Sequence, residues 1–173
     1  PELARAEELG IPAITRAQAL GARMEGYENS IAISGTHGKT TTTSMVSLIL
    51  EHAKLEPTIL VGGNLAEIGG NVKVGRGPYF VTEACEYRDS FLELRPKIEV
   101  ILNIDSDHLD YFKDIDHIVK SFEKFAKAVP EDGKLIAYDA NPFVNKIIKD
   151  IPGVITYAYN RNCAYYITNV TFD

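Results

Sequence analysis

Short apolar runs rich in β-branched and aromatic residues recur along the chain and alternate with segments of helical periodicity. The runs that predict strands are SIAIS (30–34), PTILV (57–61), YFVTE (79–83), IEVILNI (98–104), KLIAY (134–138) and VITYAY (154–159). Strands that are apolar on both faces and separated by helices are typical of a mainly parallel sheet that is covered on both sides. The pattern therefore predicts an α/β fold.

Amphipathic segments between these runs predict the helices. The clearest is 115–129, where apolar residues follow i, i+3, i+4, i+7 spacing and either Asp114 or Asp116 is placed to cap the first turn. The other predicted helices are 1–9, 15–25, Lys39 to about Ala53, and 141–150. Together with the strands they predict helices on both faces of the sheet.

Two stretches depart from this alternation. VGGNLAEIGGN (61–71) is rich in glycine and asparagine, and we expect it to form a long flexible loop beyond a strand end, suited to a second substrate. The tail YYITNVTFD (165–173) is expected to be a strand that stops without a cap. We therefore expect the sequence to be part of a longer protein.

Composition and charge narrow the class of protein. The 173 residues are 45% hydrophobic and 24% charged, as in ordinary globular proteins. The formal net charge of −6 argues against a surface for nucleic acid or anionic membrane, which would need a basic stripe. Cys85 and Cys163 do not form a disulfide framework pattern, so a reducing cytoplasm is expected. No apolar run approaches the ~20 residues that span a bilayer.

The stretch SGTHGKTTTT (34–43) lies between a predicted strand and a predicted helix, where an α/β sheet binds its ligands. Gly35 and Gly38 allow the backbone to curl, so that its N–H groups point at an anion, and the helix adds the positive end of its dipole. Lys39 is placed to contact a terminal phosphate. The hydroxyl of Thr40 stands where a P-loop holds Mg²⁺.

This motif is a variant of the P-loop, because the strict pattern has a glycine where Ile33 stands. A glycine turn followed by a threonine cap would give the same letters. The apolar strand before the motif and the apolar helix after it favour binding of nucleotide phosphates. Thr36, His37 and Thr41 belong to the same predicted cradle, in which Thr41 presents a second hydroxyl to phosphate.

Polar residues at two further strand ends complete the candidate site. Glu83 ends YFVTE in the layout of a Walker-B acid, and a phosphoryl-transfer site needs such a metal ligand besides Thr40. His108 lies in ILNIDSDHLDYF (101–112), where an asparagine and three acids surround it. We expect a second metal site there.

A strand-end carboxylate or a lone histidine is more often structural, but sharing one edge of the sheet with Lys39 favours the ligand interpretation. Three more charged residues, Glu86, Arg88 and Asp89, follow on the loop after the Walker-B-like strand. Charged loop residues are usually solvated, so we rank these three below Glu83 as ligands.

Three segments, taken in this order, resemble the Mur ligases, the ATP-dependent amide-forming enzymes of peptidoglycan precursor synthesis. They are GTHGKTTTT (35–43), TEACEYRDSFLELRP (82–96) and NIDSDHLDYF (103–112). The resemblance extends over nearly the whole chain. It implies that residues 1–29 are the end of an amino-terminal UDP-binding domain and that residues 30–173 are part of the central ATP-binding domain. It also implies that the carboxy-terminal domain of the family is absent.

The resemblance further implies roles for the candidate catalytic residues Lys39, Glu83 and His108. Lys39 would contact the β- and γ-phosphates of ATP, Thr40 and Glu83 would hold one Mg²⁺, and His108 would help to hold a second near the substrate carboxylate. In the family reaction that carboxylate becomes an acyl phosphate. An amino group then displaces phosphate and leaves an amide, ADP and phosphate.

The segment AYDANPF (137–143) resembles the family's adenine-side segment, so Asn141 is expected to contact adenine. Tyr138 departs from the family pattern, in which a polar amide is expected. Several relatives carry a carbamylated lysine after the motif that contains the histidine. Lys120 and Lys124 offer no clear equivalent, and we assign none.

Because it contains a histidine, the motif GTHGKT most resembles that of the family branch that joins L-alanine to the lactyl carboxylate of UDP-N-acetylmuramate. A recycling ligase that attaches an intact murein peptide to the same nucleotide sugar shares GTHGKT, so both substrates stay open. A third alternative is a module that holds Mg–ATP without turnover, which applies above all to this stretch of chain taken alone.

Overall fold

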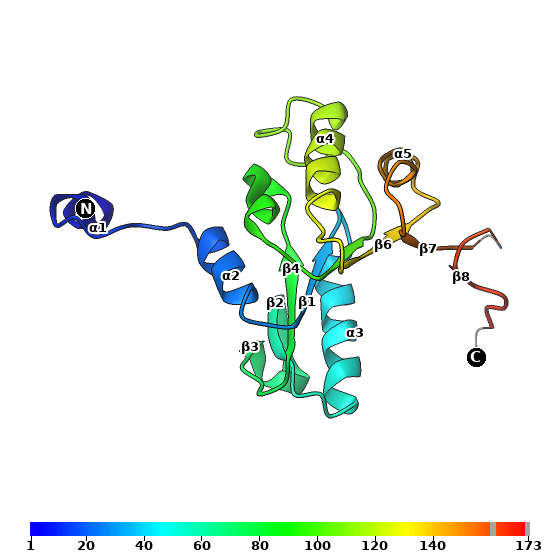
Figure 1. Ribbon diagram of the computed structural model, residues 1–173, viewed down its shortest axis with the longest axis horizontal. Helices are drawn as coiled ribbons and strands as arrows, with labels where there is room; N and C mark the ends of the chain where they lie inside the picture. Colours follow the sequence, from blue (N-terminus) through cyan, green and yellow to red (C-terminus); the bar gives the residue numbers. More distant parts are fainter. Residues whose placement is uncertain (160–161, 172–173) are drawn as a thin grey trace.

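The centre of the fold is an eight-stranded sheet of order β3-β2-β4-β1-β5-β6-β7-β8 (Figure 1). The computed structural model describes residues 1–159 and 162–171. The strands are β1 (Asn29–Ser34), β2 (Thr58–Leu65), β3 (Gly70–Lys73), β4 (Tyr79–Ala84), β5 (Ile98–Ile101), β6 (Lys134–Tyr138), β7 (Ile155–Ala158) and β8 (Tyr165–Tyr166). All neighbours in the sheet are parallel except β2 and β3. The predicted α/β fold with a mainly parallel sheet is confirmed.

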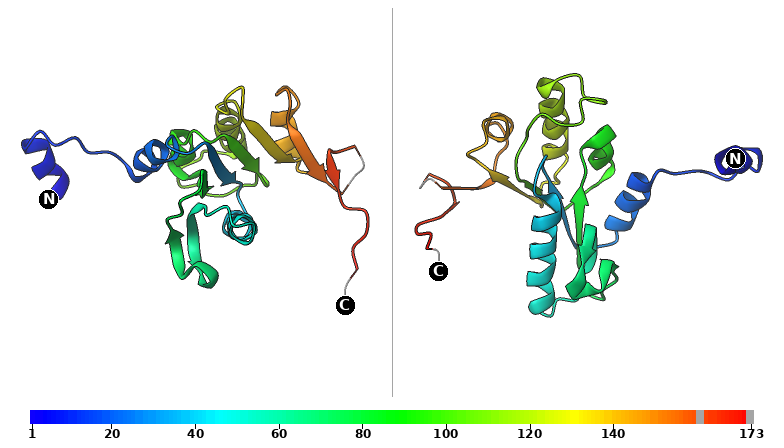
Figure 2. Two further views of the ribbon diagram at one scale, coloured as in Figure 1. Left: turned by 60° about the horizontal axis from the view of Figure 1, so that its bottom comes forward. Right: turned by 180° about the vertical axis from the view of Figure 1, so that it is seen from behind.

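Helices cover both faces of this sheet (Figure 2). They are α1 (Glu2–Glu8), α2 (Arg16–Met24), α3 (Lys39–His52), α4 (Ile115–Ala126) and α5 (Pro142–Ile148), with 3₁₀ turns η1 (Ala66–Ile68) and η2 (Tyr87–Glu93). On one face, Val46 and Leu50 of α3 pack against Ile31, Ile33 and Val100. On the other face, a larger apolar core joins the sheet to α2, η2, α4 and α5.

Helix α4 shows how local sequence sets the bounds of an element. Of the two aspartates predicted as its cap, Asp114 takes that role, because its carboxylate accepts a hydrogen bond from the backbone N–H of His117 at 2.8 Å. The helix ends at Ala126, before the predicted end at Val129. Val129 precedes Pro130, whose ring disfavours the helical conformation for the residue before it.

The prediction of a long flexible loop over 61–71 is wrong for most of that stretch. β2 continues to Leu65, η1 follows, and β3 returns antiparallel to β2 with Leu65 opposite Gly70. Gly69 and Gly70 have φ values of 76° and 158°. Glycine adopts such positive φ readily, so these two residues let the chain reverse within a short turn.

Two other predicted strands are shorter than expected. β5 ends at Ile101 rather than at the end of 98–104, because the backbone beyond it pairs with the loop after β1, where the N–H of Thr36 donates to the carbonyl of Asn103 at 3.1 Å. Of the predicted tail strand, the structure forms β8, which pairs with β7. Residues 172 and 173 of that prediction lie outside the described part of the chain.

The amino-terminal segment is attached to the sheet through α2. α1 buries no residue and lies away from the sheet at the end of an extended segment (Figure 1). α2 packs against η2, where a Cβ added at Gly21 would lie 2.2 Å from the carbonyl oxygen of Glu93. Among the residues that the structure describes, no helix combines the length and the apolar character that crossing a membrane requires.

Candidate functional site

The candidate residues meet at the edge of the sheet where β1, β4 and β5 end. These three strands are parallel neighbours, so the loops that follow them lie side by side. The first loop leads into Lys39, Glu83 lies at the end of β4, and His108 lies on the loop after β5. The structure thus brings together three residues that the sequence predicts to share one site.

Two glycines allow the loop after β1 to lie tightly against its neighbour. Gly35 and Gly38 have φ values of 139° and 83°, and Gly38 is the N-cap of α3. A Cβ added at Gly35 would lie 3.0 Å from the Cβ of Leu102 and 3.2 Å from the backbone nitrogen of Asn103. Both positions therefore need glycine, as a phosphate-binding turn at a helix N-terminus does.

The segment after β5 holds this loop in place. The side-chain oxygen of Asn103 accepts from the N–H of His37 at 2.8 Å, and its amide donates back to the carbonyl of His37 at 3.0 Å. The hydroxyl of Thr36 accepts from the N–H of Asp105 at 2.9 Å. The two loops are therefore fixed to each other by side chains as well as by backbone. Asn103, which the sequence shows only as a polar neighbour of His108, is a clamp on the loop.

Lys39 is held almost entirely by protein atoms. Its ammonium donates to the carbonyls of Gly35 at 2.6 Å and Thr36 at 3.3 Å, and to the carboxylate of Glu86 at 2.9 Å. The side chain of Glu86 is only 2% exposed and that of Lys39 is 15% exposed. Lys39 and Glu86 thus form a buried ion pair at the mouth of the loop.

The ranking of Glu86 as a solvated loop residue is therefore wrong. The chain turns back on itself directly after β4, with the N–H of Phe91 donating to the carbonyl of Cys85 at 3.0 Å, and this turn buries the carboxylate. Its partner Lys39 lies 47 positions away in the sequence. Spacing along the chain carries no signal for such a pair; only the second acid of TEACE hints at it.

Glu83 and Thr40, the predicted ligands of one Mg²⁺, flank the same pair of glycines on β2. The N–H of Gly62 donates to the carboxylate of Glu83 at 2.6 Å, and a Cβ added at Gly62 would lie 2.8 Å from that carboxylate. A Cβ added at Gly63 would lie 3.3 Å from the methyl group of Thr40. β2, which supplies these glycines, therefore forms one wall of the site.

The donor set fits a Mg²⁺ ion that a nucleotide brings with it. Mg²⁺ in such sites is held by one or two carboxylates together with phosphate oxygens and water, rather than by a full protein cage. Within residues 1–159 and 162–171, no group of three or more His, Cys, Asp or Glu side chains is arranged to hold a metal. One hydroxyl and one carboxylate, from Thr40 and Glu83, are what a phosphate-bound Mg²⁺ requires of the protein.

His108 lies on the Lys39 side of the site. Its ring lies against that of Tyr87, with centroids 4.8 Å apart and planes tilted by 41°, and its Nε2 is 4.0 Å from the carboxylate of Glu86. The residue adopts a left-handed φ of 52°, which is uncommon for a side chain with a Cβ. Such a conformation is found at functional sites, where surrounding contacts hold it.

Contacts between the loops after β4 and β5 supply that support. The hydroxyl of Tyr87 donates to Asp110 at 2.8 Å, and the hydroxyl of Tyr111 donates to Asp89 at 2.7 Å. The hydrogen bond to Asp89 raises the pKa of Tyr111. Asp89 also accepts from Ser121 of α4. These bonds connect both loops to one helix and fix the backbone that carries the histidine.

The remaining predicted residues of the nucleotide site have the following positions. His37 is exposed on the loop, with Nε2 3.8 Å from Asp105, and Thr41 is exposed in the first turn of α3. Asn141 is the N-cap of α5, where its side-chain oxygen accepts from the N–H of Val144 at 3.1 Å and its amide donates to a backbone carbonyl. Its contact with adenine stays a prediction.

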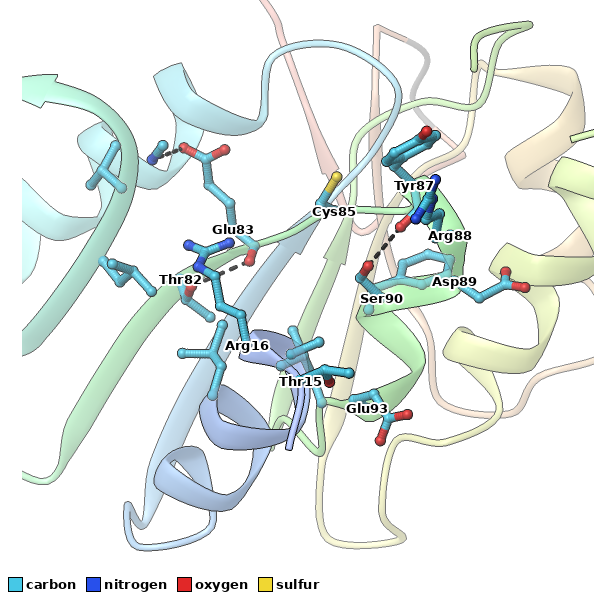
Figure 3. A pocket seen from close by; sticks show the side chains of 17 residues that line it. Thr15, Arg16, Thr82, Glu83, Cys85, Tyr87, Arg88, Asp89, Ser90 and Glu93 are labelled. Carbon is cyan, nitrogen blue, oxygen red and sulfur yellow. Dashed lines mark hydrogen bonds between the residues drawn. The ribbon is translucent and has the colours of Figure 1, made fainter. Parts of the chain in front are cut away.

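A pocket of about 550 Å³ lies beside Glu83, between α2, the ends of β2 and β4, and η2 (Figure 3). Arg16 reaches from α2 toward Thr82 and Glu83, and Arg88 lies on the opposite side. Arg88 and Asp89 both have positive φ values, of 54° and 55°, so the wall made by η2 is conformationally strained. The pocket offers two cations and several hydroxyl groups to a ligand.

Comparison with known proteins gives one consistent family. The family described as the Mur ligase middle domain matches residues 33–173. A UDP-N-acetylmuramate–L-alanine ligase from Alkaliphilus metalliredigens is 54% identical over 174 residues, which cover all of this chain and 38% of that protein. The chain thus spans well under half the length of this relative.

Two solved structures share the fold. The UDP-N-acetylmuramate:L-alanyl-gamma-D-glutamyl-meso-diaminopimelate ligase from Neisseria meningitides is 28% identical, with a TM-score of 0.80 over 90% of this chain and 53% of that one. The UDP-N-acetylmuramate-alanine ligase from Thermotoga maritima is also 28% identical, with a TM-score of 0.76 over 91% of this chain and 35% of that one.

Proposed function

The chain belongs to the Mur ligase family, and we propose on that premise that its full-length protein joins L-alanine to the lactyl carboxylate of UDP-N-acetylmuramate with cleavage of ATP to ADP and phosphate. The observation that carries the proposal is the loop that ends in Lys39, placed at a strand end beside Glu83 and His108. The choice of L-alanine is supported by 54% identity to a ligase named for that substrate. Because the reaction consumes ATP, we place it in the cytoplasm.

The reaction has two bond-forming steps. An oxygen of the lactyl carboxylate attacks the γ-phosphorus of ATP, a P–O bond forms, and the bond to ADP breaks. The amino group of L-alanine then attacks the acyl carbon, the C–N bond forms, phosphate leaves, and the nitrogen loses its extra proton. A carboxylate that approaches a triphosphate needs its charge offset, and Lys39 with the N–H groups of the loop would do this.

Thr40 and Glu83 would hold one Mg²⁺, and His108 would help to hold a second near the carboxylate. When bound, the metal would neutralise part of the phosphate charge. Gly62 orients the Glu83 carboxylate by its 2.6 Å hydrogen bond, so the ligand does not depend on a flexible side chain alone.

We place the acceptor substrate in the pocket beside Glu83. Arg16 and Arg88 supply cations to an anionic nucleotide sugar, and the pocket opens next to the phosphate loop. Arg16 belongs to the segment 1–29, which we propose to be the end of an amino-terminal UDP-binding domain, and the rest of the chain to be part of the central ATP-binding domain. The substrate would then lie between these two parts.

A second substrate also fits the site. One of the two solved structures compared above is a ligase named for a peptide substrate, and its identity to this chain, 28%, equals that of the ligase named for alanine. The same site chemistry serves an amino acid and a peptide, because both present an amine to an acyl phosphate. The alternative function is therefore addition of an intact murein peptide to UDP-N-acetylmuramate.

The deciding experiment measures ADP release by the full-length protein with Mg–ATP and UDP-N-acetylmuramate, given either L-alanine or a free murein tripeptide. Turnover with L-alanine is the expected result. Turnover with the peptide alone would retain the mechanism and replace the substrate. If no ADP were released with either amine, the proposed ligase function would be contradicted.

The metal assignment has its own test. Replacement of Glu83 by Gln, or of His108 by Ala, removes a proposed ligand and should raise the Mg²⁺ concentration for half-maximal activity by about 10- to 100-fold. Glu131→Gln, which removes an exposed carboxylate near the start of β6, is the matched control and should not change it. The same Mg²⁺ dependence in both site variants and the control would remove these residues from the metal sites.

A further inference from the structure

The buried carboxylate of Glu86 is a charged group at the candidate site to which the proposed function gives no role. Both of its oxygens contact the ammonium of Lys39, Oε2 at 2.9 Å and Oε1 at 3.3 Å, and Oε1 also lies 4.0 Å from Nε2 of His108. Only 2% of the side chain is exposed. A carboxylate so placed is bordered by two residues that the proposed function assigns to phosphate and metal.

The geometry of Lys39 requires an exchange of partners. An ammonium group has three N–H donors. In this structure they are directed at Gly35, Thr36 and Glu86. A phosphate can reach the ammonium only when one of these contacts is given up. Among the three, Glu86 alone carries a negative charge, so it competes with phosphate for the same cation.

Glu86 in turn cannot be left without a partner. A buried carboxylate that loses its counter-ion is strongly unfavourable, because water does not replace the lost interaction. The nearest other basic group is His108. Its Nε2 lies 4.0 Å from the carboxylate, and it would have to approach by about 1 Å to form an ordinary hydrogen bond. Its ring already lies against that of Tyr87, the residue next to Glu86 in the chain, with centroids 4.8 Å apart.

We propose that Glu86 is a positioning residue that couples Lys39 to His108. Before the nucleotide binds, Glu86 pairs with the ammonium of Lys39. When the nucleotide phosphate binds that ammonium, Glu86 releases it and pairs with His108 at the acceptor side of the site. The inference rests on the proposed function, because it assumes that Lys39 binds phosphate. It adds that filling the phosphate cradle is linked to placing the histidine.

The test is Glu86→Gln in the full-length protein, with the Kd for Mg–ATP and kcat measured separately. The neutral amide competes less well with phosphate, so the Kd should fall about three- to tenfold. The histidine loses the charge that positions it, so kcat should fall about 10- to 100-fold. A residue that merely supports the fold would not tighten binding while slowing turnover. A Kd equal to or higher than that of the wild type would overturn the proposal.

The conservative variant Glu86→Asp keeps the charge and should return the Kd to near the wild-type value. Lys39→Ala separates this inference from the function on which it rests. If the wild type and Lys39→Ala bind Mg–ATP equally, the phosphate assignment itself fails. If Lys39→Ala weakens binding and Glu86→Gln leaves it unchanged, only the positioning role fails.

A measurement on the wild type keeps the proposal testable even if Glu86→Gln does not fold. In a crystal structure with Mg²⁺ and a non-hydrolysable ATP analogue, Lys39 should bond a phosphate oxygen and Glu86 should lie within hydrogen-bond distance of His108. A Lys39–Glu86 pair unchanged at 2.9 Å, with His108 still at 4.0 Å, would overturn it.

Discussion

Two glutamates are both buried, one in the turn after β4 and one within β5, and they differ in what surrounds them. Glu86, at the carboxyl edge, is 2% exposed and forms an ion pair with Lys39. Glu99, in the interior of β5, is fully buried between Ala32 of β1 and Leu135 of β6. Among the residues that the structure describes, neither oxygen of Glu99 has a hydrogen-bond partner.

The difference separates a buried carboxylate that has a cationic partner from a buried carboxylate that has none. Burial raises the pKa of Glu99 well above its ordinary value of 4.5, because a carboxylate without a partner is poorly solvated there. The protonated form of Glu99 supports the fold below pH 4.5, and this support is lost as the pH rises through the raised pKa. Burial alone therefore does not distinguish these two acids; the presence or absence of a charged partner does.

Removal of Lys39 would make Glu86 resemble Glu99, and this is the largest effect expected. Lys39→Ala removes the cation that lies 2.9 Å from a buried carboxylate and leaves only His108, at 4.0 Å, beside it. This should lower the free energy of unfolding by about 3–5 kcal/mol as well as weaken Mg–ATP binding. Urea denaturation and calorimetric titration measure the two effects.

The double variant Lys39→Ala/Glu86→Gln is the matched control for that comparison. It removes both charges, so most of the lost stability should return while Mg–ATP binding stays weak. If Lys39→Ala alone were as stable as the wild type, the carboxylate of Glu86 would not depend on Lys39 as its counter-ion.

Neutralising Glu99 should have the opposite sign. Glu99→Gln is isosteric and cannot ionise, so its free energy of unfolding should exceed that of the wild type by about 1–3 kcal/mol at alkaline pH. The gain should shrink as the pH falls through the raised pKa toward 4.5 and vanish below 4.5, where the wild-type carboxyl is protonated in both the folded and the unfolded protein. Denaturation at a series of pH values, with Glu131→Gln as the control, measures it. The same gain at every pH would contradict the account.

A third carboxylate extends the comparison, because it is exposed and still stabilises the fold. Asp114 caps α4 through the N–H of His117, so Asp114→Ala should cost about 1 kcal/mol of stability. Asp114→Asn keeps an oxygen acceptor at the cap and should cost less. Thermal unfolding of both variants distinguishes them, and equal losses would mean that the cap is not the cause.

Local chemistry explains why much of the architecture could be predicted. The apolar runs that became β1, β4, β5 and β6 are too apolar to face water on either side, and helices had to cover them. Gly35, Gly38 and Lys39 predict a phosphate-binding loop, because each of these positions has a conformational or chemical requirement that few other residue types meet. These signals lie within ten residues of each other, so no knowledge of the fold is needed to find them.

The residues that were missed depend on partners distant in sequence. Glu86 gains its importance from Lys39, and Asn103 from the backbone of His37 across 66 positions. Glu99 is a single polar letter in an otherwise apolar strand, and its isolation follows only from the burial of both neighbouring strands. The turn between β2 and β3 was missed because Gly69 and Gly70 are typical of both a loop and a tight reversal.

The position of β1 in the middle of the sheet has a consequence for how the chain reaches its native state. β1 precedes both of its neighbours in the chain by a long stretch of sequence, with Asn29 opposite Tyr79 and Ile31 opposite Ile98. Closing such distant contacts costs chain entropy before any pairing rewards it, so folding should be slow compared with a protein of local contacts. The loop that carries Lys39 cannot take its shape until the segment with Asn103 has arrived to clamp it. We therefore expect the central part of the sheet and the loop that carries Lys39 to form together.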